Sequence, residues 1–282
     1  MSSGEQQPEQ AVVIAGVGLI GGSVALALRA AAPAVRVIGI GRNAERLQKA
    51  VAEGLIDEFA SELLPEHGVH GGLGVICLPV DRIPAAAGQL LNAGCDVVTD
   101  AGSVKQNICT QMRGCPEFVG AHPIAGSEQS GFEHAAGDLF QGRICVVCRE
   151  DTEHVAVQRT LAFWQMLGMT CRVMPAERHD RILALTSHLP HILASVAAGC
   201  VTSEHLEFVG TGFRDTTRIA AGGDELWTSI LMDNAPACVA ALDLALERLN
   251  RFRAALGAGE ASAIRQLWGE AAQLRRSLTE VK

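Results

Sequence analysis

Short apolar runs alternate with longer segments of helical periodicity over the first 174 residues of the chain. The runs are rich in valine and isoleucine and end at glycine, proline or aspartate, as strands buried in parallel sheets do. We expect strands at 12–15, 35–40, 74–78, 96–99, 144–149 and 169–173, with another beginning at 118. Helices are expected at 24–31, 44–54, 84–92 and 153–167. This alternation predicts a doubly wound, mostly parallel α/β domain over residues 11–174, with 169–173 as the last strand of its sheet.

The pattern changes after Pro175, where every long segment has helical periodicity. We therefore place a domain boundary there and expect an all-helical domain over 175–282, with a helix at 176–198 that is kinked at Pro190. Further helices are expected at 224–233, 237–256 and 260–281. The last helix carries an apolar stripe that suits a core and also the seam of a homodimer. The stripe consists of Ile264, Leu267, Trp268, Ala271, Leu274 and Leu278.

Three glycines follow the first expected strand at the spacing G-x-G-x-x-G, namely Gly16, Gly18 and Gly21. The first permits a sharp turn, the second lets the backbone approach a pyrophosphate, and the third lets the helix pack closely on the strand. The start of the following helix offers free N–H groups to phosphate oxygens, and Leu19 and Ile20, between the glycines, are expected to contact the cofactor as well. A glycine-rich turn can also be purely structural, but this strand–turn–helix context predicts a Rossmann-like dinucleotide site.

The end of the second strand bears on the choice of cofactor. Enzymes that favour NAD usually carry Asp or Glu there to bind the ribose 2′-hydroxyl, whereas this chain has Gly41 and Arg42. A guanidinium in place of a carboxylate favours NADP, or use of both NADP and NAD. Alternatively, Arg42 faces solvent or stacks on the adenine. Pro79, at the carboxyl end of another strand, is expected at the same cofactor edge.

A loop dense in polar groups follows the strand that begins at 118. His122 stands directly before a proline, which favours extended backbone and presents the imidazole at the strand end, where a base for hydride-transfer chemistry belongs. Ser103, Ser127 and Glu128 accompany it. A structural histidine bonded to a loop carbonyl is the alternative, but this company favours a functional role.

The helical domain contains two polar groups that suit a substrate. His188 and His191 lie beside the expected kink. The pair could ligate a metal, but no third ligand lies at a recognisable offset. We therefore favour substrate binding by one of the two histidines and packing by the other. Arg214 and Arg218 flank Asp215 between glycines and threonines, which suits a carboxylate clamp. A solvated charged loop is the alternative for that segment.

The composition indicates which kind of molecule the protein binds. The chain is 48% hydrophobic and 19% charged, and its net charge of -8 disfavours nucleic acid and favours a small molecule. No apolar stretch reaches the length of a membrane span, and residues 1–10 are expected to be a disordered tail. The nine cysteines are expected to be reduced and buried, in a cytoplasmic protein. Cys145 and Cys148 should point to opposite faces of a strand, so no metal site is expected there.

Five motifs, in this order along the chain, resemble those of the prephenate and arogenate dehydrogenases of tyrosine biosynthesis. The resemblance covers nearly the whole chain beyond residue 10. The motifs are Gly16-Val-Gly-Leu-Ile-Gly-Gly-Ser23, Asp100-Ala-Gly-Ser-Val-Lys105, His122-Pro-Ile-Ala-Gly-Ser-Glu128, Ser187-His-Leu-Pro-His191 and Gly212-Phe-Arg-Asp-Thr-Thr-Arg-Ile219.

The resemblance implies an oxidative decarboxylation. Hydride passes from the hydroxyl-bearing ring carbon to a nicotinamide, and loss of the ring carboxylate as CO2 gives a phenol. By the same resemblance, His122 accepts the hydroxyl proton and Ser103 orients that histidine and the substrate. Arg218 binds the ring carboxylate, and His191 lies near the substrate side chain.

Charge and sequence departures add detail to that resemblance. From charge alone, Glu128 and Asp215 are plausible counter-ions of Arg218 before substrate binds. Arg214 stands where a lysine often does, and Gly41-Arg42 where many relatives have an acidic residue.

Other dehydrogenase classes and a non-catalytic protein are the alternative functions. The chain contains no tyrosine, which excludes the dehydrogenase classes that use a tyrosine acid. A β-hydroxyacid-type dehydrogenase is the nearest rival, but it relies on a lysine in the helical region, and the chain has none between Pro175 and Thr279. A protein that senses NADP without turnover is the rival from another class. The sequence does not decide between prephenate and arogenate.

Overall fold

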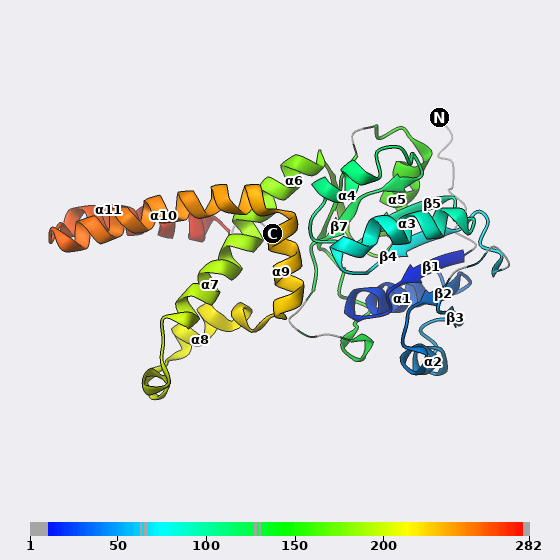
Figure 1. Ribbon diagram of the computed structural model, residues 1–282, viewed down its shortest axis with the longest axis horizontal. Helices are drawn as coiled ribbons and strands as arrows, with labels where there is room; N and C mark the ends of the chain where they lie inside the picture. Colours follow the sequence, from blue (N-terminus) through cyan, green and yellow to red (C-terminus); the bar gives the residue numbers. More distant parts are fainter. Residues whose placement is uncertain are drawn as a thin grey trace. The chain divides into compact units, whose positions relative to one another are not determined.

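The computed structural model describes residues 11–62, 64, 67–126, 129, 131–149 and 151–278. Its centre is a parallel sheet of six strands in the order β3-β2-β1-β4-β5-β6 (Figure 1). This order reverses direction between β1 and β4, which creates the switch point where ligands of such sheets bind. The strands are β1 (Ala11–Ala15), β2 (Arg36–Ile40), β3 (Glu58–Ala60), β4 (Leu73–Ile76), β5 (Val97–Asp100) and β6 (Phe118–Val119).

Helices cover both faces of this sheet because alternate residues of each strand point to opposite sides. Val12 and Ile14 of β1 pack in one apolar cluster, whereas Val13 and Ala15 pack in the other. The first cluster includes residues of α1, α2 and α5, and the second includes residues of α3 and α4. The helices are α1 (Leu19–Ala31), α2 (Ala44–Ala52), α3 (Ile83–Asn92), α4 (Gln106–Gln111) and α5 (Val155–Met166). The doubly wound α/β fold predicted from the sequence is confirmed.

The later strands differ from the expectation of a single sheet. Residues 169–173 were expected to complete the main sheet, but β7, β8 and β9 form a separate sheet of three strands. β7 is antiparallel to β8, which is parallel to β9. The change of partner occurs at Gly120, whose carbonyl accepts a hydrogen bond from Cys148 N (2.8 Å). Hydrophobic pattern does not encode pairing partners. The strands are β7 (Ala121–Pro123), β8 (Ile144–Val147) and β9 (Thr170–Val173).

The chain after Pro175 is helical, as expected. α6 (Ala176–Leu183) and α7 (Leu189–Gly199) form one run, joined by a π-helical turn at Ala184–His188. That turn ends at His188, just before Leu189 and Pro190, and because Pro190 has no N–H for the helix ladder, the irregularity lies where the kink was expected. By length and composition alone this run could cross a membrane, a test that helices of globular proteins also pass.

The segment with the paired arginines is mostly helical rather than a loop. It forms α8 (Thr211–Thr217) and a 3-10 turn at Arg218–Ala221, followed by α9 (Asp224–Asp233). α9 contacts the turn that follows β4, and its Ile230 packs in the apolar cluster of α3 and α4. The segment through α9 is therefore continuous with the α/β core.

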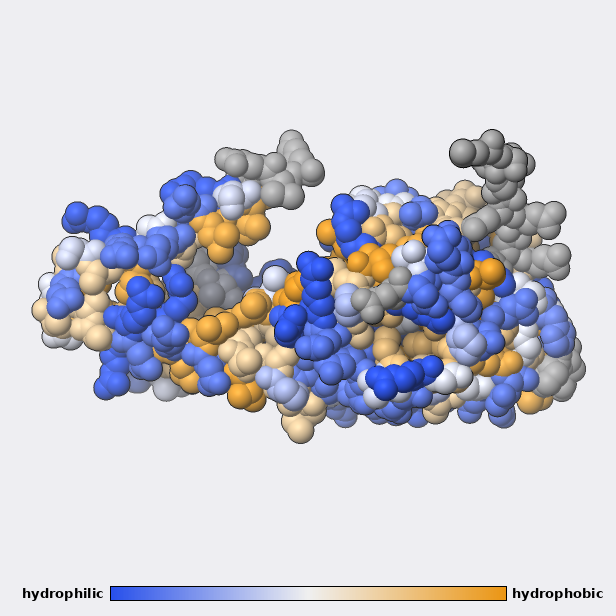
Figure 2. All heavy atoms as spheres, turned by 90° about the horizontal axis from the view of Figure 1, so that it is seen from above, coloured by the Kyte–Doolittle hydropathy of each residue, from blue (hydrophilic) through white to orange (hydrophobic). Residues whose placement is uncertain are grey.

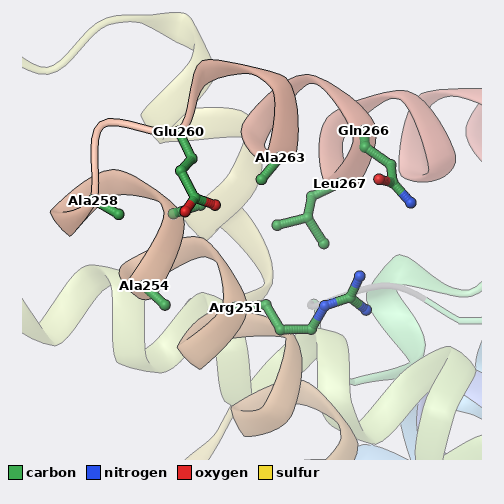
Figure 3. A pocket seen from close by; sticks show the side chains of 8 residues that line it. Arg251, Ala254, Ala258, Glu260, Ala263, Gln266 and Leu267 are labelled. Carbon is green, nitrogen blue, oxygen red and sulfur yellow. The ribbon is translucent and has the colours of Figure 1, made fainter.

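A second compact unit begins at Ala235 and consists of α10 (Ala235–Gly257) and α11 (Ala261–Ser277). A pocket of about 310 Å³ lies within this unit, where Arg251 and Leu267 extend toward the space between the helices (Figure 3). The structure divides into its two compact units after Asn234. The domain boundary that the sequence analysis places between residues 174 and 175 stays a prediction. The proposed tail, residues 1–10, lies outside the described residues.

Apolar side chains remain exposed on the helices of both units, and Figure 2 shows apolar patches among charged ones. Within α10 and α11, Trp268 and Leu274 are each 71% exposed. A monomeric protein rarely leaves many large apolar side chains in solvent. Further exposed members are Leu185, Leu193 and Val196 of the α6–α7 run and Val239, Leu244, Leu246, Leu249 and Leu256 of α10.

Candidate active site

The glycine turn between β1 and α1 has the geometry that its spacing predicts. Gly16 has φ +97°, and a Cβ there would lie 2.5 Å from the Cys77 carbonyl oxygen. A Cβ on Gly21 would collide with the carbonyl oxygen of Gly16. By contrast, a Cβ on Gly18 would meet no described atom within 4 Å. The first and third glycines thus close the turn, and the second leaves room for a ligand to approach the backbone.

The residues around this turn fit a dinucleotide. Gly18 is the N-cap of α1, no side chain caps that helix end, and its first turn, which starts with Leu19 and Ile20, has no acidic residue. Its N–H groups and positive dipole end are therefore available to a pyrophosphate. Arg42 is exposed just after β2, and Pro79 just after β4. These strands flank β1, so both residues lie at the same sheet edge as the glycines.

A buried ion pair supports the loop that follows β5. The Lys105 ammonium pairs with the Asp100 carboxylate, and both side chains are inaccessible to solvent. Asp100 also accepts hydrogen bonds from Gly102 N (2.8 Å) and Ala121 N (3.0 Å). The carboxylate thereby joins the Ser103 loop to the start of β7. Ser103 is half-buried in that loop.

His122 lies in β7 at the centre of a buried polar cluster. Its Nδ1 is 2.8 Å from Nε2 of His179 in α6, and the two rings meet edge to face. Nδ1 of His179 is 2.7 Å from Oδ1 of Asp180. The Asp180 carboxylate also accepts hydrogen bonds from the backbone N–H groups of Lys105 and Gln106, each at 2.8 Å, at the start of α4.

The cluster keeps His122 neutral. Burial of the imidazole holds the pKa of His122 well below its usual value, and the positive charges that His179 and Lys105 can carry lower it further. A neutral imidazole has one nitrogen with a free lone pair. His122 can therefore accept a proton near pH 7, as a general base must.

A second group of side chains surrounds His191 at the start of α7. The His191 ring stacks on Trp227 of α9, with centroids 3.6 Å apart, and its Nδ1 donates to the Ser187 carbonyl (2.9 Å). Burial lowers the pKa of His191, and the Arg218 charge lowers it further. Arg218 therefore lies within electrostatic range of His191, which places a cation and an aromatic face in one neighbourhood.

His188 has a structural role in the same helical run. It is buried, and its Nδ1 lies 3.1 Å from Nδ2 of Asn234, which also donates to the Asp180 carbonyl (2.9 Å). Burial lowers the pKa of His188 to about 4. The two histidines beside the kink thus have different surroundings, with His188 in the interior and His191 half-exposed.

The arginines and the aspartate of the expected carboxylate clamp are exposed to solvent. Arg214 and Asp215 lie exposed on α8, and Arg218 is exposed on the turn after it. Ser127 and Glu128 lie outside the described residues. The expected pairing of Arg218 with Glu128 or Asp215 therefore stays a prediction.

Sequence reasoning missed His179, Asp180 and Trp227. His179 and Asp180 precede the π-helical turn on the helix that was expected at 176–198 from its apolar periodicity. A histidine next to an aspartate on the buried side of that helix was the available signal, because buried polar residues need partners. Trp227 carried no comparable signal, since its stacking on His191 depends on the tertiary placement of α9.

Thiols and metal ligands add no second site among the described residues. Cys145 is buried within β8 and Cys148 just beyond it, as the sequence predicts. Burial raises the pKa of the Cys148 thiol, which disfavours the nucleophilic thiolate. Among the described residues, no three His, Cys, Asp or Glu side chains are grouped to hold a metal ion.

Two family models match the chain in succession. The model described as "Prephenate dehydrogenase, nucleotide-binding domain" matches residues 24–173, and "Prephenate dehydrogenase, dimerization domain" matches residues 175–270. The chain is 31% identical to the prephenate dehydrogenase of Bacillus subtilis over 262 residues, which are 88% of this chain and 70% of the relative. It is 29% identical to the cyclohexadienyl dehydrogenase of Zymomonas mobilis over 280 residues, 95% of each.

A solved structure agrees with these matches. Prephenate dehydrogenase from A. aeolicus, crystallised with hydroxyphenyl propionate and NAD+, superposes with a TM-score of 0.87 at 27% identity, covering 99% of this chain and 100% of the other. The two family models together span most of the described residues, with their division next to Pro175. With this agreement in sequence and fold, the chain belongs to the prephenate dehydrogenase family.

Proposed function

We propose that the protein catalyses the oxidative decarboxylation of prephenate or arogenate, with hydride transfer to NAD(P), in tyrosine biosynthesis. The observation that carries this proposal is a buried, neutral histidine, His122, within the matched nucleotide-binding domain of a chain of this family. Family membership supports the reaction, and the geometry supports the residue that performs its proton transfer. The product would be 4-hydroxyphenylpyruvate from prephenate and tyrosine from arogenate.

The cofactor, when bound, supplies a nicotinamide ring that accepts hydride. Gly16, Gly18 and Gly21 would hold its pyrophosphate at the start of α1. His122 accepts the hydroxyl proton as the ring carbon loses hydride. Ser103 is proposed to orient the substrate hydroxyl, and the hydrogen bond from Ala121 N to Asp100, which joins its loop to β7, supports this role. Loss of CO2 then makes the ring aromatic, which drives the reaction forward.

Arg218 and His191 are proposed to bind the substrate. A guanidinium pairs with a carboxylate in bidentate geometry, which suits the ring carboxylate. His191 donates from Nδ1 to a carbonyl, so in its neutral form Nε2 carries a lone pair. That nitrogen can accept a hydrogen bond from the ammonium of arogenate, whereas the ketone of prephenate has no donor. Ser127, Glu128 and Arg214 are proposed to complete the substrate site.

Arg42 is proposed to favour NADP while still allowing NAD. It is exposed just beyond β2, where a carboxylate would bind the ribose 2′-hydroxyl. A guanidinium there is free to meet a 2′-phosphate, because the nearby Glu45 lies on the first turn of α2 rather than at the strand end.

A homodimer through the helical domain is also proposed. The family model over residues 175–270 is described as a dimerization domain, and the α10–α11 hairpin exposes Trp268 and Leu274. Such apolar side chains are typical of obligate interfaces. Sedimentation velocity should give twice the monomer mass of 29.7 kDa. A monomer at micromolar concentration would contradict this arrangement.

The β-hydroxyacid dehydrogenase alternative is not favoured, because both family models and the curated relatives point elsewhere. The NADP-sensing alternative is tested directly by turnover. Purified protein is mixed with NADP or NAD and with prephenate or arogenate, and reduced cofactor is followed by absorbance while the phenol product is identified by chromatography. Formation of one phenol per reduced cofactor is expected. Tight cofactor binding without turnover of either substrate would favour the sensor.

A further inference from the structure

His122 has two ring nitrogens, and only the one that carries a lone pair can accept the substrate proton. A contact with His179 determines which nitrogen that is. His122 Nδ1 lies 2.8 Å from His179 Nε2, so one of these two nitrogens carries the hydrogen between them. Which one carries it decides whether Nε2 of neutral His122 has a lone pair or a proton.

The hydrogen positions in the row His122, His179 and Asp180 can be assigned by starting from Asp180. Asp180 accepts hydrogen bonds from the N–H groups of Lys105 and Gln106, and a carboxylate acceptor has no hydrogen to give to His179. His179 must therefore donate from Nδ1 to Asp180 (2.7 Å). In neutral His179 the lone pair then lies on Nε2. That nitrogen can only accept, so His122 donates from Nδ1 and its own lone pair lies on Nε2.

The charges around His122 are consistent with a neutral imidazole that has these hydrogen positions. Lys105, paired with Asp100, and His188 of the π-helical turn both oppose a positive charge on His122. The carboxylate of Asp180 favours such a charge through His179, which is completely buried. The imidazole is therefore neutral at rest, and the imidazolium formed during the reaction has a carboxylate two hydrogen bonds away.

We propose that His179, held by Asp180, is a positioning residue that fixes His122 in the tautomer with hydrogen on Nδ1 and the proton-accepting lone pair on Nε2. This inference rests on the proposed function for its kinetic consequences, but the tautomer itself is a property of the free protein. His179 touches neither substrate nor cofactor in this role, and acts through the ring of His122.

In the proposed reaction, His122 takes a proton from the substrate and later returns it to the product. The substrate O–H bond breaks and its proton moves to Nε2 of His122, while the C–H bond breaks and its electron pair leaves as hydride to the nicotinamide. The bond to the ring carboxylate then breaks, CO2 leaves, and the electron pair enters the ring. The resulting phenolate oxygen takes the proton back from His122. Because no proton is released overall, a base that is only 9% exposed needs no path to solvent.

Two substitutions at one position test the proposal. In His179→Leu no acceptor faces His122 Nδ1, whereas in His179→Gln the side-chain carbonyl oxygen can replace the lone pair of Nε2. We expect kcat to fall at least about 100-fold in the leucine variant, the lower range of general-base contributions, with substrate KM and cofactor Kd within about threefold of wild type. The glutamine variant should recover at least about tenfold of that loss. His70→Gln, at an exposed histidine, is the matched control and should change nothing.

The spectroscopic readout does not depend on turnover. Nitrogen-15 NMR of the histidine rings in the cofactor-free protein should show His122 with a protonated Nδ1 and an unprotonated Nε2. His179→Gln should keep this tautomer, and the acid limb of the kcat profile should move in His179→Leu but not in His70→Gln. Wild-type protein with hydrogen on His122 Nε2 would overturn the proposal. Wild-type kcat and pH profile in a folded leucine variant would overturn it too.

These outcomes separate the two proposals. Absence of turnover on both substrates, with the expected tautomer, would defeat the proposed function and leave the tautomer assignment standing. Normal turnover with the opposite tautomer would do the reverse. If His179→Leu does not fold, the glutamine variant and the wild-type spectrum decide the question.

Discussion

Alanine at two glycines of the same turn should separate folding from cofactor binding. A methyl group on Gly21 would collide with the Gly16 carbonyl and would lie 3.0 Å from the Ile14 side chain, so the turn must shift. A methyl group on Gly18 would meet no described atom within 4 Å, and its φ of -107° is accessible to alanine. The same chemical change is therefore costly to the fold at one position and harmless at the other.

The expected magnitudes follow from this geometry. Overpacking of this kind costs about 1–3 kcal/mol, so Gly21→Ala should lower Tm by roughly 2–12 °C for a unit of this size. Gly18→Ala should leave Tm unchanged or slightly raised, because alanine at a compatible glycine position reduces the entropy of the unfolded chain by about 0.4–1 kcal/mol. Both variants should bind cofactor at least about tenfold more weakly, a loss of about 1.4 kcal/mol.

Differential scanning fluorimetry gives Tm, and titration of cofactor by isothermal calorimetry gives Kd. Gly54→Ala is not a suitable control because Gly54 has φ +74°, whereas Gly88→Ala meets no described atom and serves well. The reasoning would be refuted by a Gly18→Ala protein that binds cofactor like wild type. It would equally be refuted by a Gly21→Ala protein of unchanged Tm.

Three further predictions concern cofactor choice, substrate binding and pH. Arg42→Asp should shift the ratio of kcat/KM for NADP over NAD at least about tenfold toward NAD, since a carboxylate repels the 2′-phosphate; an unchanged ratio would exclude contact with that phosphate. Arg218→Gln should mainly raise substrate KM, measured by steady-state kinetics, and a fall in kcat alone would contradict its binding role. Because burial lowers the pKa values of His122 and His188, the unfolded chain binds more protons below about pH 6.5. The free energy of unfolding in urea should therefore fall between pH 6.5 and 4, by at most about 1.4 kcal/mol per pH unit for each histidine, and a value independent of pH there would contradict their neutral burial.

The sequence predicted the α/β fold because its signals were local. Valine-rich runs, glycine turns and apolar periodicity each act within a few residues, and β1 and β2 follow them closely, whereas α1 begins at Leu19 rather than at residue 24. β3 was not foreseen, because Glu58-Phe-Ala60 is short and has no apolar run. The separate sheet of β7, β8 and β9 was also missed, since partner choice at Gly120 depends on contacts far apart in the chain.

The candidate site was predicted in part for the same reason. His122 was chosen because a proline follows it and polar residues surround it, which are features of the local sequence. His179 and Asp180 were not chosen, because their role arises only when α6 packs against the start of α4 and brings a histidine 57 positions away to His122. Resemblance supplied the role of Ser103, and it singled out Arg218 and His191 from the arginine and histidine pairs that the residue pattern had indicated.

The central claim, that His122 is the base of an oxidative decarboxylation, is tested most directly by His122→Asn assayed beside wild type. Wild-type protein should form reduced cofactor and a phenol in equal amounts from prephenate or arogenate. The variant should bind substrate and cofactor with Kd values within about threefold of wild type, while kcat falls by about 100-fold or more, the range typical of losing a general base. A variant that retains wild-type kcat, or a wild-type protein that turns over neither substrate, would contradict the claim.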